Sequence, residues 1–507
     1  MGIQHLVHAA IALACALACE RFGPLGSASP AWLLVGLLVP PLLAQAARRR
    51  FLRGRHRLGG ALMEVLRHSS VLIYGLGIHA CDWIELSTRI GGGELIADGT
   101  WPQLGLALAL LPWVALEFVS VEAQVRARAA TREHVRALRA YELRMRAMAL
   151  APLVLLYGAL LLVGLNETWR VRIGQVGLLG ALHAAAVVGI VLLTAPLVLR
   201  YTMDVRALPQ GALRTALEHV GARARFRCLG LYAWNTEGRM ANAAILGLTP
   251  RTRAVVFTDA LLEQLSLAEL CAVYAHEIGH AARNHLLALA GLTIVMLVGG
   301  GWLIEACLPP EEWWSLLGLL PVLGAWFAAV GWLSRRFELE ADLHAFDVLD
   351  DPRALVSALQ RVSGMHAEDR DSWRHFSSAR RIQFLIDVAR ETSIGAALGR
   401  RLRAWRVAIF AATTILLTVR AAGYARSWRE DQAWADLRLG EFERAAARGA
   451  ASPDGSLEAL LALAAELPAD PAAREPQRLL ERAEADYARG AYAKGRAWLE
   501  LSAWRGG

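Results

Sequence analysis

Long apolar segments alternate with short charged ones along most of the chain, a pattern typical of a helical protein with many membrane spans. The candidate spans are Leu6–Cys19, Trp32–Ala47, Ser69–Trp83, Leu104–Val121, Met148–Leu165, Val176–Leu199, Leu286–Cys307, Trp314–Leu333 and Val407–Tyr424. Several are short for a hydrocarbon core that requires ~20 residues. We expect about six spans in residues 1–200, a two-span hairpin over residues 286–333 and a last span over residues 407–424.

Arginines concentrate in three segments that flank these spans, and the positive-inside rule places such segments in the cytoplasm. They are Arg48, Arg49, Arg50, Arg53, Arg55 and Arg57, then Arg126, Arg128, Arg132, Arg136, Arg139, Arg144 and Arg146, then Arg400, Arg401, Arg403 and Arg406. Counting spans from these segments puts Tyr201–His285 and Ser334–Arg406 on the cytoplasmic side. The hairpin between them should bring the two segments together.

The composition agrees with a membrane protein. Hydrophobic residues make up 55% of the 507 residues, and the mean hydropathy is +0.35, which is rarely reached by a soluble chain of this size. The net charge of +8 would also suit a nucleic-acid-binding protein. However, the arginines cluster beside apolar segments and no nucleic-acid-binding module is visible, so we expect no nucleic-acid partner.

The most strand-like part of the chain lies just before the hairpin. Short β-type segments at Phe226–Ala233, Ala241–Leu246 and Ala254–Thr258 are bounded by turn residues and predict a small β-meander. A helix should begin after Ser266, because Ser266 and Glu269 have the spacing of a capping box, in which two side chains satisfy free backbone donors.

That helix carries the segment His276-Glu277-Ile278-Gly279-His280. Residues four apart share one helix face, so the two imidazoles can hold one metal ion. Zinc lowers the pKa of a water molecule that it binds to ~7, and Glu277 is placed to accept its proton. We predict one Zn²⁺ per chain, with Glu277 as the catalytic base. The alternative is a polar helix face that solvent satisfies.

A catalytic zinc ion needs a third protein ligand. The helix expected directly after the hairpin offers four candidates, which are Glu338, Glu340, Asp342 and His344. Glu338 and Asp342 share a helix face, so one could bind zinc while the other orients a ligand imidazole. The spacing does not rank the four further.

These motifs resemble those of the HtpX-type and CAAX prenyl protease family of membrane zinc endopeptidases. The similarity covers Leu229–Leu385, including the hairpin. Its matching pieces are Asn242-Ala243, the helix Glu269–His285 with HEIGH, SRRFELEAD at Ser334–Asp342 and HFSSARRI at His375–Ile382.

The resemblance implies roles for residues that spacing alone does not assign. It makes Glu338 the third zinc ligand and Asp342 a residue that orients a ligand. It implies that Asn242 and Ala243 lie on an edge strand that holds the substrate backbone. It also places His375 and Arg381 near the zinc ion, where they help to stabilise the oxyanion. Without the resemblance, the alternatives are a turn residue for Asn242 and a surface or helix-capping histidine for His375. Arg381 would then pair with a carboxylate such as Asp387 or satisfy helix-end carbonyls.

The expected fold class is mainly α: a polytopic helical membrane protein with a zincin-like metalloprotease domain that carries the β-meander. That domain should occupy residues 201–406, and residues 425–507 should form a helical tail. Two stretches of the tail, around Gly440 and Gly490, resemble tetratricopeptide helix pairs, although an ordinary helical hairpin explains them equally well.

Two further residues are open at this stage. His285 follows the HEIGH segment and is interpreted as structural. Glu117 lies inside an apolar span, where a charge is expensive, so it lines a polar cavity, pairs with an arginine or sits near the interface.

The expected function is a zinc metalloendopeptidase, a hydrolase that cuts polypeptides at the cytoplasmic membrane face in quality control of membrane proteins. One alternative is a CAAX-type protease that trims a specific or lipidated peptide. Another is a non-catalytic zinc-containing membrane scaffold, which has no use for Glu277. The Ala-, Arg- and Leu-rich composition looks bacterial, so the expected location is the inner membrane, with multiple passes. The lipid bilayer, a polypeptide substrate and a protein partner for the tail are the expected partners.

Overall fold

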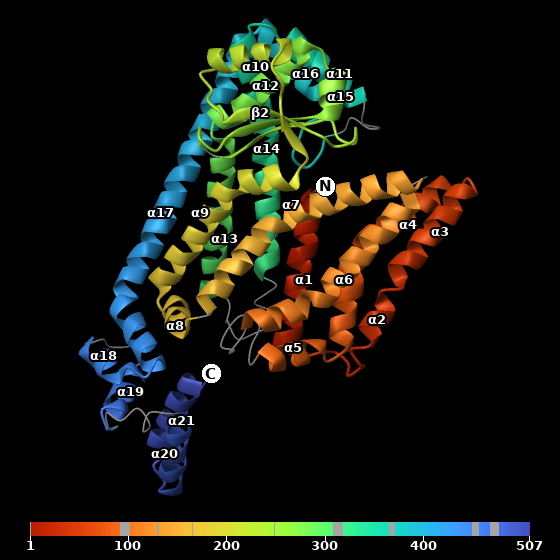
Figure 1. The fold of residues 1–507 in the computed structure, drawn as a ribbon. Coiled ribbons are helices and arrows are strands. Elements are labelled where there is room, and N and C mark those ends of the chain that lie inside the picture. Colours follow the sequence, from red (N-terminus) through yellow and green to blue (C-terminus); the bar gives the residue numbers. More distant parts are fainter. Residues whose placement is uncertain are drawn as a thin grey trace. The chain divides into compact units, whose positions relative to one another are not determined.

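The computed structural model describes residues 2–91, 102–128, 131–164, 166–247, 249–307, 318–364, 371–448, 456–466 and 476–506 (Figure 1). The chain divides into two compact units. One comprises Met1–Val191 with Tyr424–Gly507, and the other comprises Leu192–Gly423. Both are rich in helices, and the described strands all lie in the second unit, so the predicted mainly α fold with a small sheet is confirmed.

The N-terminal part is built from helices alone. They are α1 (Gly2–Phe22), α2 (Trp32–Gly36), α3 (Val39–Leu52), α4 (His56–Ala80), α5 (Trp83–Gly91), α6 (Pro102–Arg128), α7 (Arg132–Gly164), α8 (Glu167–Gln175) and α9 (Gly177–Thr202). The apolar segment Trp32–Ala47 is divided between α2 and α3. Proline stands at the start of α3, where its missing N–H and fixed φ favour a new helix start over continuation.

Glu117 lies buried among α4, α6 and α7. Its Oε1 accepts a hydrogen bond from Arg146 Nε at 3.0 Å, and its Oε2 accepts one from the Ser70 hydroxyl at 2.5 Å. Glu117 is therefore a carboxylate that pairs with an arginine, which is one of the three interpretations that the sequence left open.

Three of the described helices are long and apolar enough to cross a membrane, at Leu104–Arg128, His285–Ile304 and Thr392–Arg438. A fourth is counted if α8 and the following Gly177–Ile190, which meet at a 105° bend, form one span. The sequence suggested about nine. Leu6–Cys19 lies in α1 and Ser69–Trp83 runs from α4 into α5, and neither α1 nor α4 is among the helices that are both long and apolar enough. Part of Trp314–Leu333 lies outside the described residues.

The second unit contains the sheet. Its elements are β1 (Val205–Ala207), α10 (Ala212–Arg223), β2 (Gly230–Trp234), β3 (Ala243–Leu246), β4 (Ala254–Thr258), α11 (Asp259–Gln264), α12 (Leu267–Ala282), α13 (His285–Cys307), α14 (Leu319–Leu349), α15 (Arg353–Gly364), α16 (Ser378–Arg390) and most of α17 (Thr392–Arg438). Figure 1 shows α10, α12, α15 and α16 gathered around the sheet.

The three expected strands are present, but the predicted meander is wrong in its pairing. The strand order is β1-β2-β4-β3, with β4 parallel to β2 and antiparallel to β3. β4 takes the central place because Val255, Val256 and Phe257 are all buried, as expected for a strand covered on both faces. β3 is consequently an edge strand, with one side open for pairing.

Helix α12 crosses α14 at close range. A Cβ atom at Gly279 would lie 2.9 Å from the Cα of Ala341 and 3.0 Å from the Cβ of His344. Such spacing leaves no room for any side chain at Gly279. This contact fixes α12, which begins with the predicted Ser266–Glu269 capping box, against the part of α14 that carries Glu338.

The tail is helical in its described parts, α18 (Phe442–Ala447), α19 (Ser456–Ala464), α20 (Pro476–Ala488) and α21 (Tyr492–Gly506). The same turn joins α17 to α18 and α20 to α21, with φ of +73° at Gly440 and +78° at Gly490. In each turn a backbone N–H reaches back five residues, from Glu441 to Asp436 and from Ala491 to Asp486, both at 2.8 Å.

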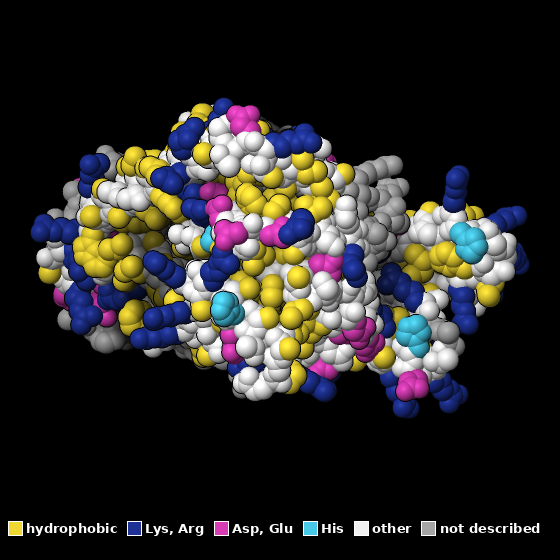
Figure 2. All heavy atoms as spheres, turned by 90° about the horizontal axis from the view of Figure 1, so that it is seen from above, with side chains coloured by type: hydrophobic (Ala, Val, Ile, Leu, Met, Phe, Trp, Pro, Cys, Tyr) yellow, Lys and Arg dark blue, Asp and Glu magenta, His cyan; other side chains and the backbone are white. Residues whose placement is uncertain are grey.

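Figure 2 shows the face seen from above in Figure 1. Over the central part of this view, basic side chains stand among acidic and hydrophobic ones. The central part of this face is therefore a surface of mixed charge with exposed apolar side chains, as folded domains commonly have.

Candidate metal centre

His276 and His280 project from one face of α12. Their Nε2 atoms lie 3.2 Å apart, and the ring centroids are 4.9 Å apart. The geometry follows from the four-residue spacing, which advances a helix by slightly more than one turn. Two ring nitrogens therefore converge on one point.

Glu338 approaches the same point from α14. Its Oε2 lies 3.6 Å from His276 Nε2, and its Oε1 lies 3.6 Å from His280 Nε2. A tetrahedral zinc ion with bonds of ~2.0–2.2 Å separates its ligand atoms by about 3.4 Å. These three residues are a group of potential ligands whose donor atoms all lie within 4.8 Å of one another. Two imidazoles and one carboxylate are a donor set that suits zinc.

The charges around the centre favour a cation. Burial acts to lower the pKa of His276, but Asp342 and Glu338 outweigh it and raise that pKa to about 10. Burial acts to raise the pKa of Glu338, but hydrogen bonds from His276 and His375 hold it well below its usual value. Burial lowers the pKa of His280 to about 3, so this imidazole is neutral and its lone pair is available. A metal ion can take the place of the proton that the carboxylates attract.

Asp342 holds the other ring nitrogen of His276. Its Oδ1 lies 2.8 Å from His276 Nδ1, and the carboxylate is completely buried. Arg381 binds both of its oxygens, with Nε at 2.8 Å and Nη2 at 2.5 Å. The remaining Nη1 of Arg381 lies 3.5 Å from Glu338. Arg381 thus pairs with Asp342 and not with Asp387, whose carboxylate accepts a hydrogen bond from Gln383.

Glu277 is partly exposed beside the two histidines. Burial of its carboxyl group raises the pKa to about 7, which suits a group that must accept and release a proton near neutral pH. It lines a cavity of about 100 Å³, whose other walls are Ile245, Gly247, Arg253, His280, Ala281, Asn284, Leu286 and Leu287. The carboxylate therefore faces a space next to the end of the edge strand β3.

His375 lies at the exposed side of the centre. Its side chain is 55% exposed, and its Nδ1 is 3.2 Å from Glu338 Oε1. The loop holds it through Ser372, whose N–H donates to the His375 carbonyl at 2.8 Å. His375 is therefore close to the candidate ligand group and open to solvent.

Asn242 and Ala243 lie at the start of β3. Asn242 is exposed, and its N–H donates to Thr258 Oγ at 2.8 Å. Ala243 is buried and pairs with Phe257 in the sheet. The backbone of this segment is thus fixed to β4 on one side, while the opposite side of β3 is the sheet edge.

Three further residues lie near the centre, and the sequence did not connect them with one another. His285, interpreted as structural, contacts His280 through its Nδ1 at 2.9 Å. Behind it lie Glu340, one of the four candidate ligands, and Arg406, one of the arginines that precede the predicted last span. A local signal existed for His285 alone, which follows His280 by five residues at a span boundary.

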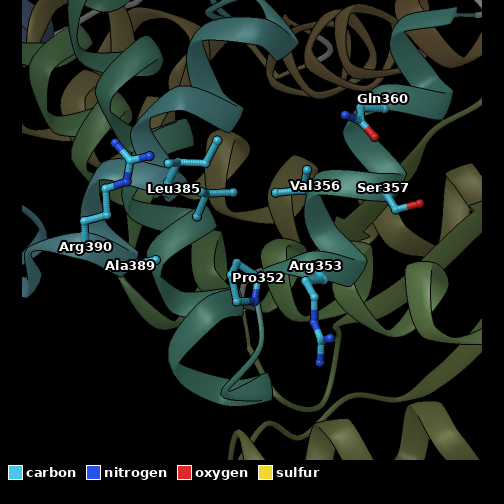
Figure 3. A pocket seen from close by; sticks show the side chains of 9 residues that line it. Pro352, Arg353, Val356, Ser357, Gln360, Leu385, Ala389 and Arg390 are labelled. Atoms are coloured by element: carbon cyan, nitrogen blue, oxygen red, sulfur yellow. The ribbon is translucent and has the colours of Figure 1, made fainter.

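A larger cavity of about 460 Å³ lies between α15 and α16 (Figure 3). It is lined by Pro352, Arg353, Val356, Ser357, Gln360, Leu385, Ile386, Ala389 and Arg390. The candidate ligands and Glu277 do not line it, so its size alone does not make it the reaction site.

Residues 207–415 match the sequence model of the family described as peptidase family M48. A protein named "Protease HtpX homolog" from Listeria monocytogenes is 29% identical over 156 residues, which cover 25% of this chain and 50% of that protein. A "CAAX prenyl protease 1 homolog" from Oryza sativa subsp. japonica is 28% identical over 206 residues, or 36% of this chain and 47% of that protein.

The chain spans about half the length of the curated relatives it matches. The crystal structure of S. mikatae Ste24p aligns with 70% of this chain and 97% of that chain, with a TM-score of 0.47 and 15% identity. Residues 207–415, which match the family model, contain the α12 and α14 residues described above. The sequence-based resemblance to the HtpX-type and CAAX prenyl protease family is confirmed.

Proposed function

We propose that this chain, whose residues 207–415 match peptidase family M48, is a zinc-dependent endopeptidase of a membrane. One observation carries the proposal. Two stretches separated by the hairpin, one with His276 and His280 and one with Glu338, converge with ligand-like spacing next to a buried carboxyl group, Glu277. This combination suits hydrolysis, because a metal site without a reaction has no use for a base at its side.

In this proposal His276, His280 and Glu338 hold one Zn²⁺, which supplies Lewis-acid catalysis and makes water acidic when it is bound. Asp342 fixes the His276 ring so that Nε2 faces His280 and Glu338, and Arg381 balances the charge of Asp342. Glu277 accepts the proton of the attacking water and delivers it to the leaving amine.

His375 is the group that we assign to the oxyanion. It is exposed, and it lies on the Glu338 side of the centre, where a substrate carbonyl can reach it. Arg381 was expected to share this role. Because two of its nitrogens bind Asp342, only Nη1, which lies 3.5 Å from Glu338, is left for an oxyanion.

The substrate is a polypeptide that binds in extended form along β3. The edge of this strand is open to main-chain hydrogen bonds, and Asn242 and Ala243 stand at its start. The cavity beside Glu277 would receive a side chain of such a peptide, because it lies at the other end of β3 near Ile245 and Gly247.

The reaction takes place at a membrane surface in this proposal. The helix α13, which begins directly after the HEIGH helix, is apolar enough to cross a membrane. The arginine distribution favours a cytoplasmic centre in a bacterial inner membrane, and quality control of membrane proteins is the proposed role. The tail helices α18 to α21 would bind a protein partner.

The match to a CAAX prenyl protease 1 homologue supports a second candidate, which is the trimming of a specific or lipidated peptide. The two candidates differ in substrate and not in chemistry. Cleavage of an unfolded membrane protein favours the first, and cleavage restricted to a lipid-modified peptide favours the second.

The test measures the zinc content and the protease activity of the full chain purified in detergent, for the wild type and for Glu277→Gln. We expect one zinc per chain in both proteins and cleavage by the wild type alone, because the substitution removes the base and leaves the ligands. Full cleavage by the variant would remove Glu277 from the mechanism. A wild-type protein without bound zinc would remove the metal centre.

A further inference from the structure

His280 is held on both sides of its ring. Its Nε2 faces His276 and Glu338, whereas its Nδ1 lies 2.9 Å from Nδ1 of His285. His285 is only 3% exposed, and its ring stacks on Phe337 at 4.0 Å with an interplanar angle of 4°. The second nitrogen of this candidate ligand therefore ends on a buried imidazole in a fixed orientation.

Two further hydrogen bonds lead from His285 away from the centre. Nε2 of His285 lies 2.9 Å from Oε2 of Glu340, and the same oxygen accepts a hydrogen bond from Nη1 of Arg406. Glu340 is 3% exposed and Arg406 is 9% exposed. The three residues come from three helices, α13, α14 and α17, so the arrangement ties together segments that are far apart in the chain.

Each atom in this series has one consistent role. If His280 gives its Nε2 lone pair to a metal, its proton is on Nδ1 and is donated to His285. His285 then accepts at Nδ1 and keeps its own proton on Nε2, which it donates to Glu340. Arg406 supplies the positive charge that a buried carboxylate requires. The donors and acceptors of His280, His285 and Glu340 Oε2 are therefore matched in sequence.

We propose that His285, Glu340 and Arg406 position His280 as a metal ligand. We call the series of hydrogen bonds that joins these three residues to His280 the relay. The inference rests on the proposed metal centre and deepens it. The relay is the counterpart of Asp342 and Arg381 behind His276, where a carboxylate contacts the ligand directly. Groups that orient a ligand and raise its basicity affect metal affinity by ~10–100-fold when they are removed.

The relay also links the centre to α17. Arg406 stands next to the apolar part of the helix that carries the predicted last span, and the Glu340 carboxylate pairs with His285 and Arg406. The orientation of His280 therefore depends on how α17 packs against α13 and α14. His285, Glu340 and Arg406 are positioning residues, because they act through His280.

The test compares two substitutions at one position in the full chain in detergent. His285→Phe keeps an aromatic ring for Phe337 but removes the acceptor for His280. His285→Asn loses the stacking but keeps a side-chain oxygen that can accept from His280. The matched control is His219→Phe, the same change at an exposed histidine of α10.

The readouts are zinc affinity by chelator competition and the visible spectrum of the Co²⁺-substituted protein. We expect zinc affinity ~10–100-fold weaker in His285→Phe, with an altered Co²⁺ spectrum, a smaller loss in His285→Asn and no change in His219→Phe. Equal zinc affinity in His285→Phe and wild type would overturn the relay. Equal losses in both His285 variants would also overturn it, since a purely structural role does not distinguish acceptors.

A second variant covers the case in which His285→Phe does not fold. Glu340→Gln keeps the shape of the side chain and removes its charge, so zinc affinity should fall by about tenfold while thermal unfolding of the metal-free protein is still cooperative. Unchanged zinc affinity in folded Glu340→Gln contradicts the relay. A wild-type chain that binds no zinc contradicts the metal centre itself, so the two failures are distinguishable.

Discussion

Asp342 contacts His276 at the ring nitrogen that does not face His280, with Oδ1 and Nδ1 2.8 Å apart. Because Asp342 is fully buried and bound to Arg381 through both oxygens, this contact has little freedom to move. It fixes which nitrogen of His276 carries the proton and which one points toward Glu338. The geometry of the proposed ligand His276 therefore depends on a residue outside the group of His276, His280 and Glu338.

Asp342→Asn should weaken zinc binding by ~10–100-fold, because an amide oxygen can still accept from His276 but carries no charge. The matched control is Asp347→Asn, at an exposed aspartate of the same helix. Chelator competition measures both affinities. Equal affinity in the two variants would mean that Asp342 does not act on the metal centre.

Gly279→Ala should destabilise the protein, since the added methyl group would meet the backbone of Ala341 at 2.9 Å. Overpacking of this kind costs ~1–3 kcal/mol. The matched control is Gly399→Ala in α17, where nothing lies within 4 Å of the added Cβ and helix propensity favours alanine by ~1 kcal/mol. Thermal unfolding in detergent compares the two, and a stable Gly279→Ala protein contradicts the close crossing of α12 and α14.

Glu269 should make stability depend on pH in the acid range. Burial acts to raise its pKa, but hydrogen bonds from Ser357 and Ser266 and the charge of Arg361 outweigh burial and lower it. A lowered pKa in the folded state means that the contribution to stability is complete above the unfolded value of ~4.3. It is lost as the pH falls from there through the folded value.

The measurement is the difference in unfolding free energy between the wild type and Glu269→Gln as a function of pH. The variant should be less stable by ~1–3 kcal/mol at neutral pH, because hydrogen bonds to a charged group are lost. The difference should shrink as the pH falls below ~4.3. A difference that does not change with pH would show that Glu269 is not a paired carboxylate in the folded protein.

Glu117 and Arg146 give a prediction for the N-terminal helices. Arg146→Met leaves the buried Glu117 carboxylate without its charge partner, which costs ~3–5 kcal/mol. The double variant Glu117→Gln with Arg146→Met should recover much of this loss, and neither protein should lose zinc. A double variant as unstable as the single one contradicts a specific pairing.

The sequence predicted best those features that depend on neighbours in the chain. The capping box of Ser266 and Glu269 and the shared face of His276 and His280 are local, and the structure has both. The three predicted strands are present, but β1 was not predicted, and the pairing differs from a meander. Pairing depends on contacts with the rest of the fold, which buries Val255, Val256 and Phe257 of β4, the strand that lies between β2 and β3.

Contacts between distant segments were harder to predict. Helix α14 offers four candidate ligands in its C-terminal half, and only the family resemblance singles out Glu338 from the sequence. His285 is separated from Glu340 by 55 residues, and Arg406 from Glu340 by 66. No periodicity connects positions so far apart, and Arg406 looked like one more charge at the end of a span.

The central claim is that α12 and α14 together hold one metal ion, and the metal content of Glu338→Ala tests it most directly. The wild type should carry one zinc per chain, and the variant should lose it at a chelator concentration that leaves the wild type loaded, because a ligand from the second stretch is missing. Zinc retained with wild-type affinity in a folded Glu338→Ala protein would contradict the account.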